Sequence, residues 1–251
     1  MVKGGRVMIN IVLSCSQQSW NKCAMGDTEE DHTYSIAKKT GELLQDYKCN
    51  VLVISKDITG TETETLNQVV TASNAFASSH EGQAFHLDIH TDGGYQGAGV
   101  SGFYYPNSEN GKDFISLIHK EVSAMTPWAD GAVSPRVLFV LAKTQATAGL
   151  IELSFHDVYA QAKHIHENAD LYAQAIVRGL VRACGLEKKK AEVKKTSYKD
   201  DDKISIWAKD AITNVTSQGI MRGDENGNFR PKDYPTREEL AVVANNLLNQ
   251  K

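Results

Sequence analysis

Short runs of apolar, β-branched residues alternate with stretches of helical apolar spacing along the first three quarters of the chain. These runs predict strands at residues 7–13, 50–55, 85–90, 102–105, 136–142 and 149–155. The helical stretches predict helices at 29–47, 63–80 and 112–125, and one or two closing helices at 158–184. Because this alternation is typical of βαβ units, the pattern predicts an α/β fold with a mostly parallel or mixed twisted sheet flanked by helices.

The hydrophobic pattern changes near Leu186. Residues 187–203 are charged and poor in large apolar side chains, which is typical of a solvated linker. Beyond this segment, helical spacing ends at Gly219, and Thr236 stands in capping-box spacing to Glu239 at the start of a second helix. The sequence therefore predicts a domain at 1–186, a linker at 187–203 and a small all-α, helix-turn-helix module at 204–251.

Composition narrows the functional classes. The 251 residues are 41% hydrophobic and 23% charged, as in ordinary globular proteins. The net charge of -4 gives no support to a nucleic-acid partner. The sequence contains no run of about 18 apolar residues, so we do not expect membrane insertion. The opening segment lacks the pattern of a secretory signal, so we expect synthesis in the cytoplasm without a signal peptide. The four scattered cysteines indicate buried free thiols rather than disulfides.

One carboxylate interrupts an otherwise apolar strand. In the segment LIELSFHD at 150–157, Glu152 falls where a buried strand would end. Ligands collect at the carboxyl ends of strands in α/β sheets, and burial raises the pKa of a carboxylate toward that of a general base. His90 ends the strand FHLDIH in the same way, so we expect the two side chains on one rim.

Further candidates surround this rim. Thr28 is placed to cap a helix with Glu29 in its first turn, where a glutamate can also serve only to stabilise the helix dipole. Glu29 and His32 are three residues apart, a spacing seen in metal sites. His156 lies four residues beyond Glu152 and faces the same side if the strand continues so far.

Three blocks of sequence carry a family resemblance. TEEDHTYSIA at 28–37, LDIHTDGG at 87–94 and LFVLAKTQATAGLIELSFHD at 138–157 resemble the zinc-dependent N-acetylmuramoyl-L-alanine amidases of the amidase-3 type, which cut bacterial peptidoglycan. The resemblance extends over roughly residues 7–184.

The resemblance implies roles for particular residues. Glu29 and His90 correspond to zinc ligands and Glu152 to the catalytic carboxylate. Where the family has a zinc-binding histidine after the first strand, this chain has Gln17, and a neutral amide is a poor zinc ligand. His156 is the first candidate for the vacant place and His32 the reserve, with Gln17 itself, the neighbouring glutamine or no bound metal as the remaining alternatives.

Residues 204–248 resemble a single S-layer homology (SLH) module. Such modules are similar to cell-wall anchors that bind pyruvylated secondary cell-wall polysaccharide, and the resemblance points to Trp207, Arg230 and Arg237. An indole face suits a sugar ring, and a guanidinium suits a carboxylate. Trp207 is alternatively a core residue, because a module this small must bury some large side chain.

The two resemblances together imply a peptidoglycan hydrolase that uses zinc-activated water to cut the amide between N-acetylmuramic acid and L-alanine. The SLH module would tether this enzyme to the bacterial cell wall. We expect a phage or prophage endolysin released by a holin, or a chain trimmed of its export signal. The alternatives are a non-catalytic wall-binding protein with an amidase-like shell and another zinc peptidase of wall peptides.

Overall fold

The computed structural model describes residues 7–56, 58–94, 99–128, 131–189 and 196–249. The chain divides into two compact units, Met1–Lys189 and Lys190–Lys251. Within the predicted linker, residues 190–195 lie outside the described residues. Of the helices described, none is both long and apolar enough to cross a membrane.

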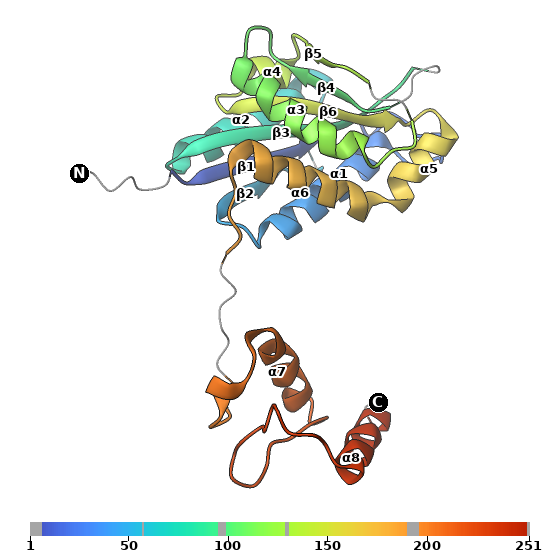
Figure 1. Ribbon diagram of the computed structural model, residues 1–251. Coiled ribbons are helices and arrows are strands. Elements are labelled where there is room, and N and C mark those ends of the chain that lie inside the picture. The colour runs from blue at the N-terminus through green and yellow to red at the C-terminus, as the bar shows by residue number, and fades with distance from the viewer. Residues whose placement is uncertain (1–6, 57, 95–98, 129–130, 190–195, 250–251) are drawn as a thin grey trace, which may run out of the picture. The chain divides into compact units, whose positions relative to one another are not determined.

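The first unit is built on a six-stranded sheet with the order β2-β1-β3-β6-β4-β5 (Figure 1). The strands are β1 (Ile9–Cys15), β2 (Cys49–Val53), β3 (Gln83–Asp92), β4 (Ser101–Tyr104), β5 (Val133–Pro135) and β6 (Thr147–Phe155). β1 pairs in parallel with β2 and β3, and β3 pairs in parallel with β6. β4 runs antiparallel to β6. The predicted mixed sheet is therefore confirmed.

Helices cover both faces of this sheet (Figure 1). One face carries α1 (Glu29–Leu44), α3 (Glu109–Ser123) and α6 (Ala169–Cys184), and the other carries α2 (Glu62–Ser79) and α4 (Phe139–Lys143). Along β1, Ile11 and Leu13 enter the first core and Val12 the second, as the two-residue period of a strand requires. The short α5 (Tyr159–Glu167) follows the end of β6.

The close packing of α3 against α6 depends on Gly179. A Cβ atom at this position would come within 2.6 Å of the Ile118 backbone, a distance that real side chains do not tolerate. The glycine therefore lets the two helices approach each other over the main core.

The prediction of a strand at residues 136–142 is wrong, because residues 139–143 form α4. Val140 packs in the cluster with Val69 and Val70 of α2, whereas Leu141 packs with Phe103 and Leu150. A helical turn sends these neighbouring side chains into two separate clusters. Periodicity alone does not distinguish a short apolar strand from a buried helical turn.

The second unit contains α7 (Lys209–Ser217) and α8 (Arg237–Leu248), preceded by the 3₁₀ turns η1 (Asp201–Lys203) and η2 (Ile206–Ala208). The predicted capping box at α8 is confirmed, since Thr236 and Glu239 bond reciprocally. The carboxylate of Asp200 accepts the backbone N–H groups of Phe229 at 2.8 Å and Arg230 at 2.9 Å. This contact fastens the loop between the helices to the start of the module.

A buried polar row runs along β1 and β3 toward the carboxyl edge of the sheet. The hydroxyl of Ser14 donates to Oδ1 of Asp88 at 2.5 Å, so it accepts from Nε2 of His86 at 2.7 Å. His86 is fully buried, and burial lowers its pKa to about 4 although the charge of Asp88 opposes the shift. His86 is therefore neutral in the folded protein at neutral pH.

We predict that His86 makes folding pH-dependent between its folded pKa of about 4 and its ordinary value of 6.5. In this window the unfolded chain binds more protons at His86 than the folded chain, so the free energy of unfolding falls as the pH falls, by at most about 1.4 kcal/mol per pH unit. Urea denaturation measures the free energy of unfolding of wild type and His86→Gln across this window. The difference between the two proteins should change as the pH falls, because only the wild type loses stability through this histidine. A difference independent of pH would contradict the prediction.

Candidate active site

The candidate site lies where β3 ends and α1 begins. Glu29 is the first residue of α1, after Thr28, whose side chain caps the helix as predicted. The Glu29 side chain is 3% exposed, yet both of its oxygens are bonded. Oε1 accepts from Nδ1 of His90 at 3.0 Å and from the Thr91 backbone N–H at 3.1 Å. Oε2 accepts from the side-chain amide of Asn21 at 2.8 Å.

His90 is held between two carboxylates. Its Nδ1 faces Glu29, and its Nε2 lies 3.4 Å from Oδ2 of Asp88. Burial lowers the pKa of His90, but the charges and hydrogen bonds of Asp88 and Glu29 outweigh burial and hold the pKa well above its ordinary value. Burial likewise raises the pKa of Glu29, and His90, Thr91 and Asn21 bring it below the usual range. The carboxylates of Asp88 and Glu29 thus strongly favour the protonated, positively charged form of His90.

Glu152 stands beside this pair. It is the register partner of His90 on the adjacent parallel strand β6, so both side chains project from the same face of the sheet. Oε2 of Glu152 is buried and has no hydrogen-bond partner within the described residues. Burial raises the pKa of Glu152 to about 8, against the opposing charge of His90. A carboxyl group that titrates near neutral pH suits general acid–base chemistry.

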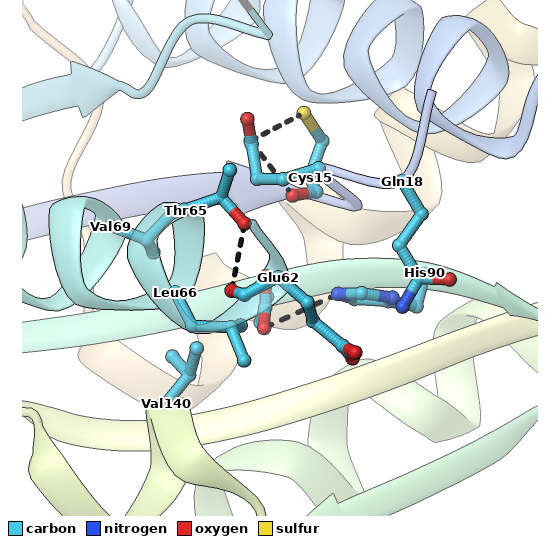
Figure 2. Close-up of a pocket in the computed structure, with 10 residues that line it drawn as sticks. Cys15, Gln18, Glu62, Thr65, Leu66, Val69, His90 and Val140 are labelled. Atoms are coloured by element: carbon cyan, nitrogen blue, oxygen red, sulfur yellow. Dashed lines mark hydrogen bonds and ion pairs between the residues drawn. The ribbon is translucent and has the colours of Figure 1, made fainter. Parts of the chain in front are cut away.

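Gln17 follows the end of β1 and is 6% exposed. Its amide nitrogen donates to the Cys15 carbonyl at 3.1 Å, whereas its Oε1 is buried without a hydrogen-bond partner in the described part of the chain. Gln17, Asp88 and His90 line a small cavity of about 20 Å³, whose other walls include Gln18 and Val69 (Figure 2). Such a volume holds little more than a water molecule.

His156 is buried near the site, and within the described part of the chain its ring nitrogens contact Thr91 and Asn21 rather than Glu29 or His90. Its Nδ1 lies 3.0 Å from the Thr91 carbonyl, and its Nε2 lies 3.1 Å from Oδ1 of Asn21. The Asn21 amide therefore bridges His156 and Glu29. The role of His156 as a metal ligand stays a prediction.

His32 lies one turn after Glu29 and contacts a different group of side chains. Its Nε2 is 2.6 Å from Oδ2 of Asp27, and its Nδ1 is 3.8 Å from Sγ of Cys23. Among the described residues, these three side chains form the one compact group of three or more metal-type donors. The structure thus brings Glu29, His90 and Glu152 to one rim and places His32 elsewhere.

Asn21 and Asp88 are two positioning residues that the sequence did not single out. The alternation in FHLDIH placed Asp88 on the same face as His90, which was a usable signal. Asn21 lies in an irregular loop where no periodic pattern identifies it.

Trp207 is 86% exposed, so its interpretation as a core residue of the module is wrong. It lines an open pocket of about 290 Å³ with side chains that include Val215, Phe229 and Lys232. The guanidinium of Arg230 lies 2.6 Å from Oε1 of Glu239. Arg237, the first residue of α8, is exposed.

The first unit is an α/β domain with a histidine and carboxylates at the rim of its sheet, joined in one chain to a small helical module. Residues 11–182 match the family described as N-acetylmuramoyl-L-alanine amidase, and residues 197–241 match the S-layer homology domain. The first match covers more than half of the sequence, and the chain therefore belongs to the N-acetylmuramoyl-L-alanine amidase family. The family and enzyme class predicted from the sequence are confirmed.

Solved structures of amidases share the fold. The catalytic domain of CwlV from Bacillus (Paenibacillus) polymyxa var. colistinus is similar with a TM-score of 0.61 and 20% identity, over 72% of this chain and 100% of that one. An N-acetylmuramoyl-L-alanine amidase from Clostridium difficile 630 is similar with a TM-score of 0.62 and 18% identity, over 72% of this chain and 98% of that one.

Curated relatives match only a short segment. An exoglucanase XynX from Acetivibrio thermocellus is 37% identical over 62 residues, which are 25% of this chain and 6% of that protein. A surface-layer 125 kDa protein from Lysinibacillus sphaericus is 41% identical over 49 residues, which are 20% of this chain and 4% of that protein. The chain therefore matches less than a tenth of the length of these relatives.

Proposed function

We propose that the chain is a zinc-dependent amidase that hydrolyses the bond between N-acetylmuramic acid and L-alanine in peptidoglycan. Family membership supports the enzyme class. The single observation that carries the assignment of residues is the placement of Glu152 beside the Glu29–His90 pair, with a pKa raised to about 8 by burial.

The side chains at this rim fit a zinc ion. A carboxylate and an imidazole, 3.0 Å apart in Glu29 and His90, are common zinc ligands. Asp88 contacts the other ring nitrogen of His90, as outer carboxylates do for metal-binding histidines. A zinc ion held here would lower the pKa of a water molecule and polarise the substrate carbonyl.

Glu152 supplies the proton transfers in this proposal. Its ionised carboxylate accepts a proton from the attacking water and then delivers that proton to the departing amine of L-alanine. Burial, with the charges of neighbouring carboxylates, raises the pKa of Glu152 to about 8 although the charge of His90 lowers it. A further positive charge near the carboxyl group would favour its ionised form. The cluster of charges therefore sets the pH at which the base is available.

We predict that Glu152→Gln lowers amidase turnover by about 10²- to 10⁴-fold, because the amide cannot carry the proton. The substitution keeps the size of the side chain and removes a buried carboxylate, so bound zinc and the folded structure should be retained. Release of L-alanine amino termini from purified walls measures the activity, and elemental analysis measures zinc. Turnover close to wild type would contradict the role of Glu152.

His156 remains the proposed third ligand, with Gln17 and His32 as alternatives. Rotation of the Asn21 amide away from Glu29 would open a path between that carboxylate and Nε2 of His156. For Gln17 the supporting observation is its buried, unpartnered Oε1 at a cavity that His90 also lines, a statement limited to the described residues.

We predict that His156→Ala removes about one equivalent of zinc together with amidase activity, whereas Gln17→Ala retains both. Elemental analysis and amino-terminus release, carried out on the same preparations, measure the two quantities. The reverse result assigns the third position to Gln17. Loss of activity in His32→Ala but not in Cys23→Ser, whose side chain contacts His32, assigns the third position to His32.

The substitution of glutamine for histidine at position 17 favours one alternative, a non-catalytic wall-binding protein with an amidase-like shell. Inactive wild-type protein that binds walls without zinc would support this alternative. Another zinc peptidase of wall peptides would instead release an amino terminus other than that of L-alanine.

We propose further that the SLH module holds a secondary cell-wall polysaccharide bearing pyruvate, through Trp207, Arg230 and Arg237. The exposed indole of Trp207 beside an open pocket supports stacking on a sugar ring. Arg230 is already paired with Glu239, so a carboxylate ligand has to compete for its guanidinium.

We predict that Trp207→Ala weakens wall binding by about 5-fold or more, since stacked aromatic contacts are worth on the order of 1 kcal/mol or more. Tyr234→Ala is the matched control, because Tyr234 is 97% exposed in the same module and does not line the pocket. Sedimentation with walls, before and after chemical removal of pyruvate, measures binding. Equal retention of both variants would contradict the proposal.

The endolysin role is also a proposal. It rests on the combination of a wall hydrolase with its own wall-binding module in one chain. Lysis of producing cells that depends on a holin would support this role, and an enzyme exported without a holin would contradict it.

A further inference from the structure

A second group of metal-type donors lies outside the Glu29–His90 rim. Cys23 and Asp27 belong to the loop before α1, and His32 belongs to the second turn of that helix. One donor atom from each of the three side chains lies within 4.8 Å of the other two. Ligand atoms around tetrahedral zinc lie about 3.4 Å apart, as bond lengths near 2.1 Å require. Small side-chain adjustments therefore suffice to bring these donors around one ion.

The loop backbone is shaped to present these side chains. The Cys23 N–H donates to the Asp27 carbonyl at 2.9 Å, and the Gly26 N–H donates to the Cys23 carbonyl at 2.9 Å. Gly26 has a φ of 98°, a conformation that favours glycine, and it closes the turn. The turn places Cys23 and Asp27 next to the imidazole of His32.

A fourth donor comes from the opposite side. Nδ1 of His166, in α5, lies 3.8 Å from Oδ2 of Asp27. The rings of His32 and His166 have centroids 5.4 Å apart. Thiolate, imidazole and carboxylate are the ligand types that zinc prefers, and four of them would complete a closed structural site.

Two observations indicate that the group is incomplete without a cation. Oδ1 of Asp27 is buried and has no hydrogen-bond partner in the described ranges, although its partner oxygen contacts both histidines. Leaving a buried carboxylate oxygen unbonded is costly. Cys23 and His32 are each 4% exposed, so these two donors are held away from bulk water, whereas the side chain of Asp27 is 30% exposed.

The group is accessible from one side. Asp27, His32 and His166 line a pocket of about 210 Å³, together with Ser35 and Lys39 among others. Lys39 pairs with Asp170, so its charge is already compensated. The pocket gives an ion an entry path past the partly exposed side chains of Asp27 and His166 to the buried side chain of His32.

We propose that Cys23, Asp27, His32 and His166 form a structural zinc site, separate from the proposed catalytic metal. The ion would fasten the loop at 21–28 to α1 and α5. This loop carries Asn21, which bonds both Glu29 and His156, and its Ala24 N–H donates to the His156 carbonyl at 2.8 Å. The second site would therefore stabilise the loop that positions Glu29 and His156 through Asn21.

Burial, followed by the charge of Asp27, raises the pKa of the Cys23 thiol to about 12. A metal ion must displace this proton on binding, which makes the affinity pH-dependent. Coordinated thiolate is also the feature that distinguishes this site from the Glu29–His90 rim, whose donors are oxygen and nitrogen.

The experiment is a Co²⁺ titration of the metal-free full-length chain, followed by absorption. Cysteine coordination gives a near-ultraviolet thiolate-to-cobalt charge-transfer band, which should appear in wild type and in His90→Ala. Cys23→Ser should abolish the band, and Asp27→Asn should weaken Co²⁺ binding at this site by at least about 10-fold. Elemental analysis should find about two equivalents of zinc in wild type and about one in Cys23→Ser.

Cys184→Ser is the matched control, because Cys184 is a buried free thiol in α6 and should leave the band unchanged. Circular dichroism of each variant establishes that it is folded. Absence of the band in wild type, or its persistence in folded Cys23→Ser, would overturn the proposal. Failure of the catalytic-zinc proposal would give a different result. Wild type would then bind one equivalent of zinc, which Cys23→Ser would lose and His90→Ala would retain.

Discussion

The contact between Glu29 and His90 is the interaction on which the candidate active site depends. It joins the start of α1 to the end of β3 over a sequence separation of 61 residues. Asp88 and Glu152 crowd the same rim, so several carboxyl groups share one nearby imidazole. Burial, reinforced by the neighbouring carboxylates, raises the pKa of Glu152, and the charges of Asp88 and Glu29 raise the pKa of His90 in spite of its burial. A rim of this charge is suited to a divalent ion, which neutralises the carboxylates without displacing them.

Much of this arrangement is readable from the sequence, because it follows from strand periodicity and helix capping. Alternation in FHLDIH places His90 at the end of a strand, and the cap at Thr28 fixes Glu29 as the first helical residue. Irregular structure carries no comparable signal. The Asn21 amide that separates His156 from Glu29 comes from a loop, and its position depends on contacts distant in sequence.

Tertiary packing also explains why the expectations for residues 136–142 and for Trp207 differ from the structure. The run at 136–142 is apolar enough for a strand, but two separate clusters take up its side chains and a helical turn satisfies both. The exposure of Trp207 likewise depends on tertiary packing within the module, and no local pattern of the sequence predicts it. Local propensity identifies elements well, whereas short apolar runs and the burial of single aromatics are decided by tertiary packing.

Gln17 lies between β1 and the loop that carries Asn21 and the Cys23–Asp27–His32 group. Its side-chain amide donates to the carbonyl of Cys15, at the end of β1. The loop is then held by Asn21 at one end and by the Cys23–Asp27–His32 group at the other. A structural ion in that group would add rigidity beside the substrate without occupying the catalytic position. In the proposed arrangement the structural ion would therefore act on the active site through this loop, by way of the hydrogen bond from Asn21 to Glu29.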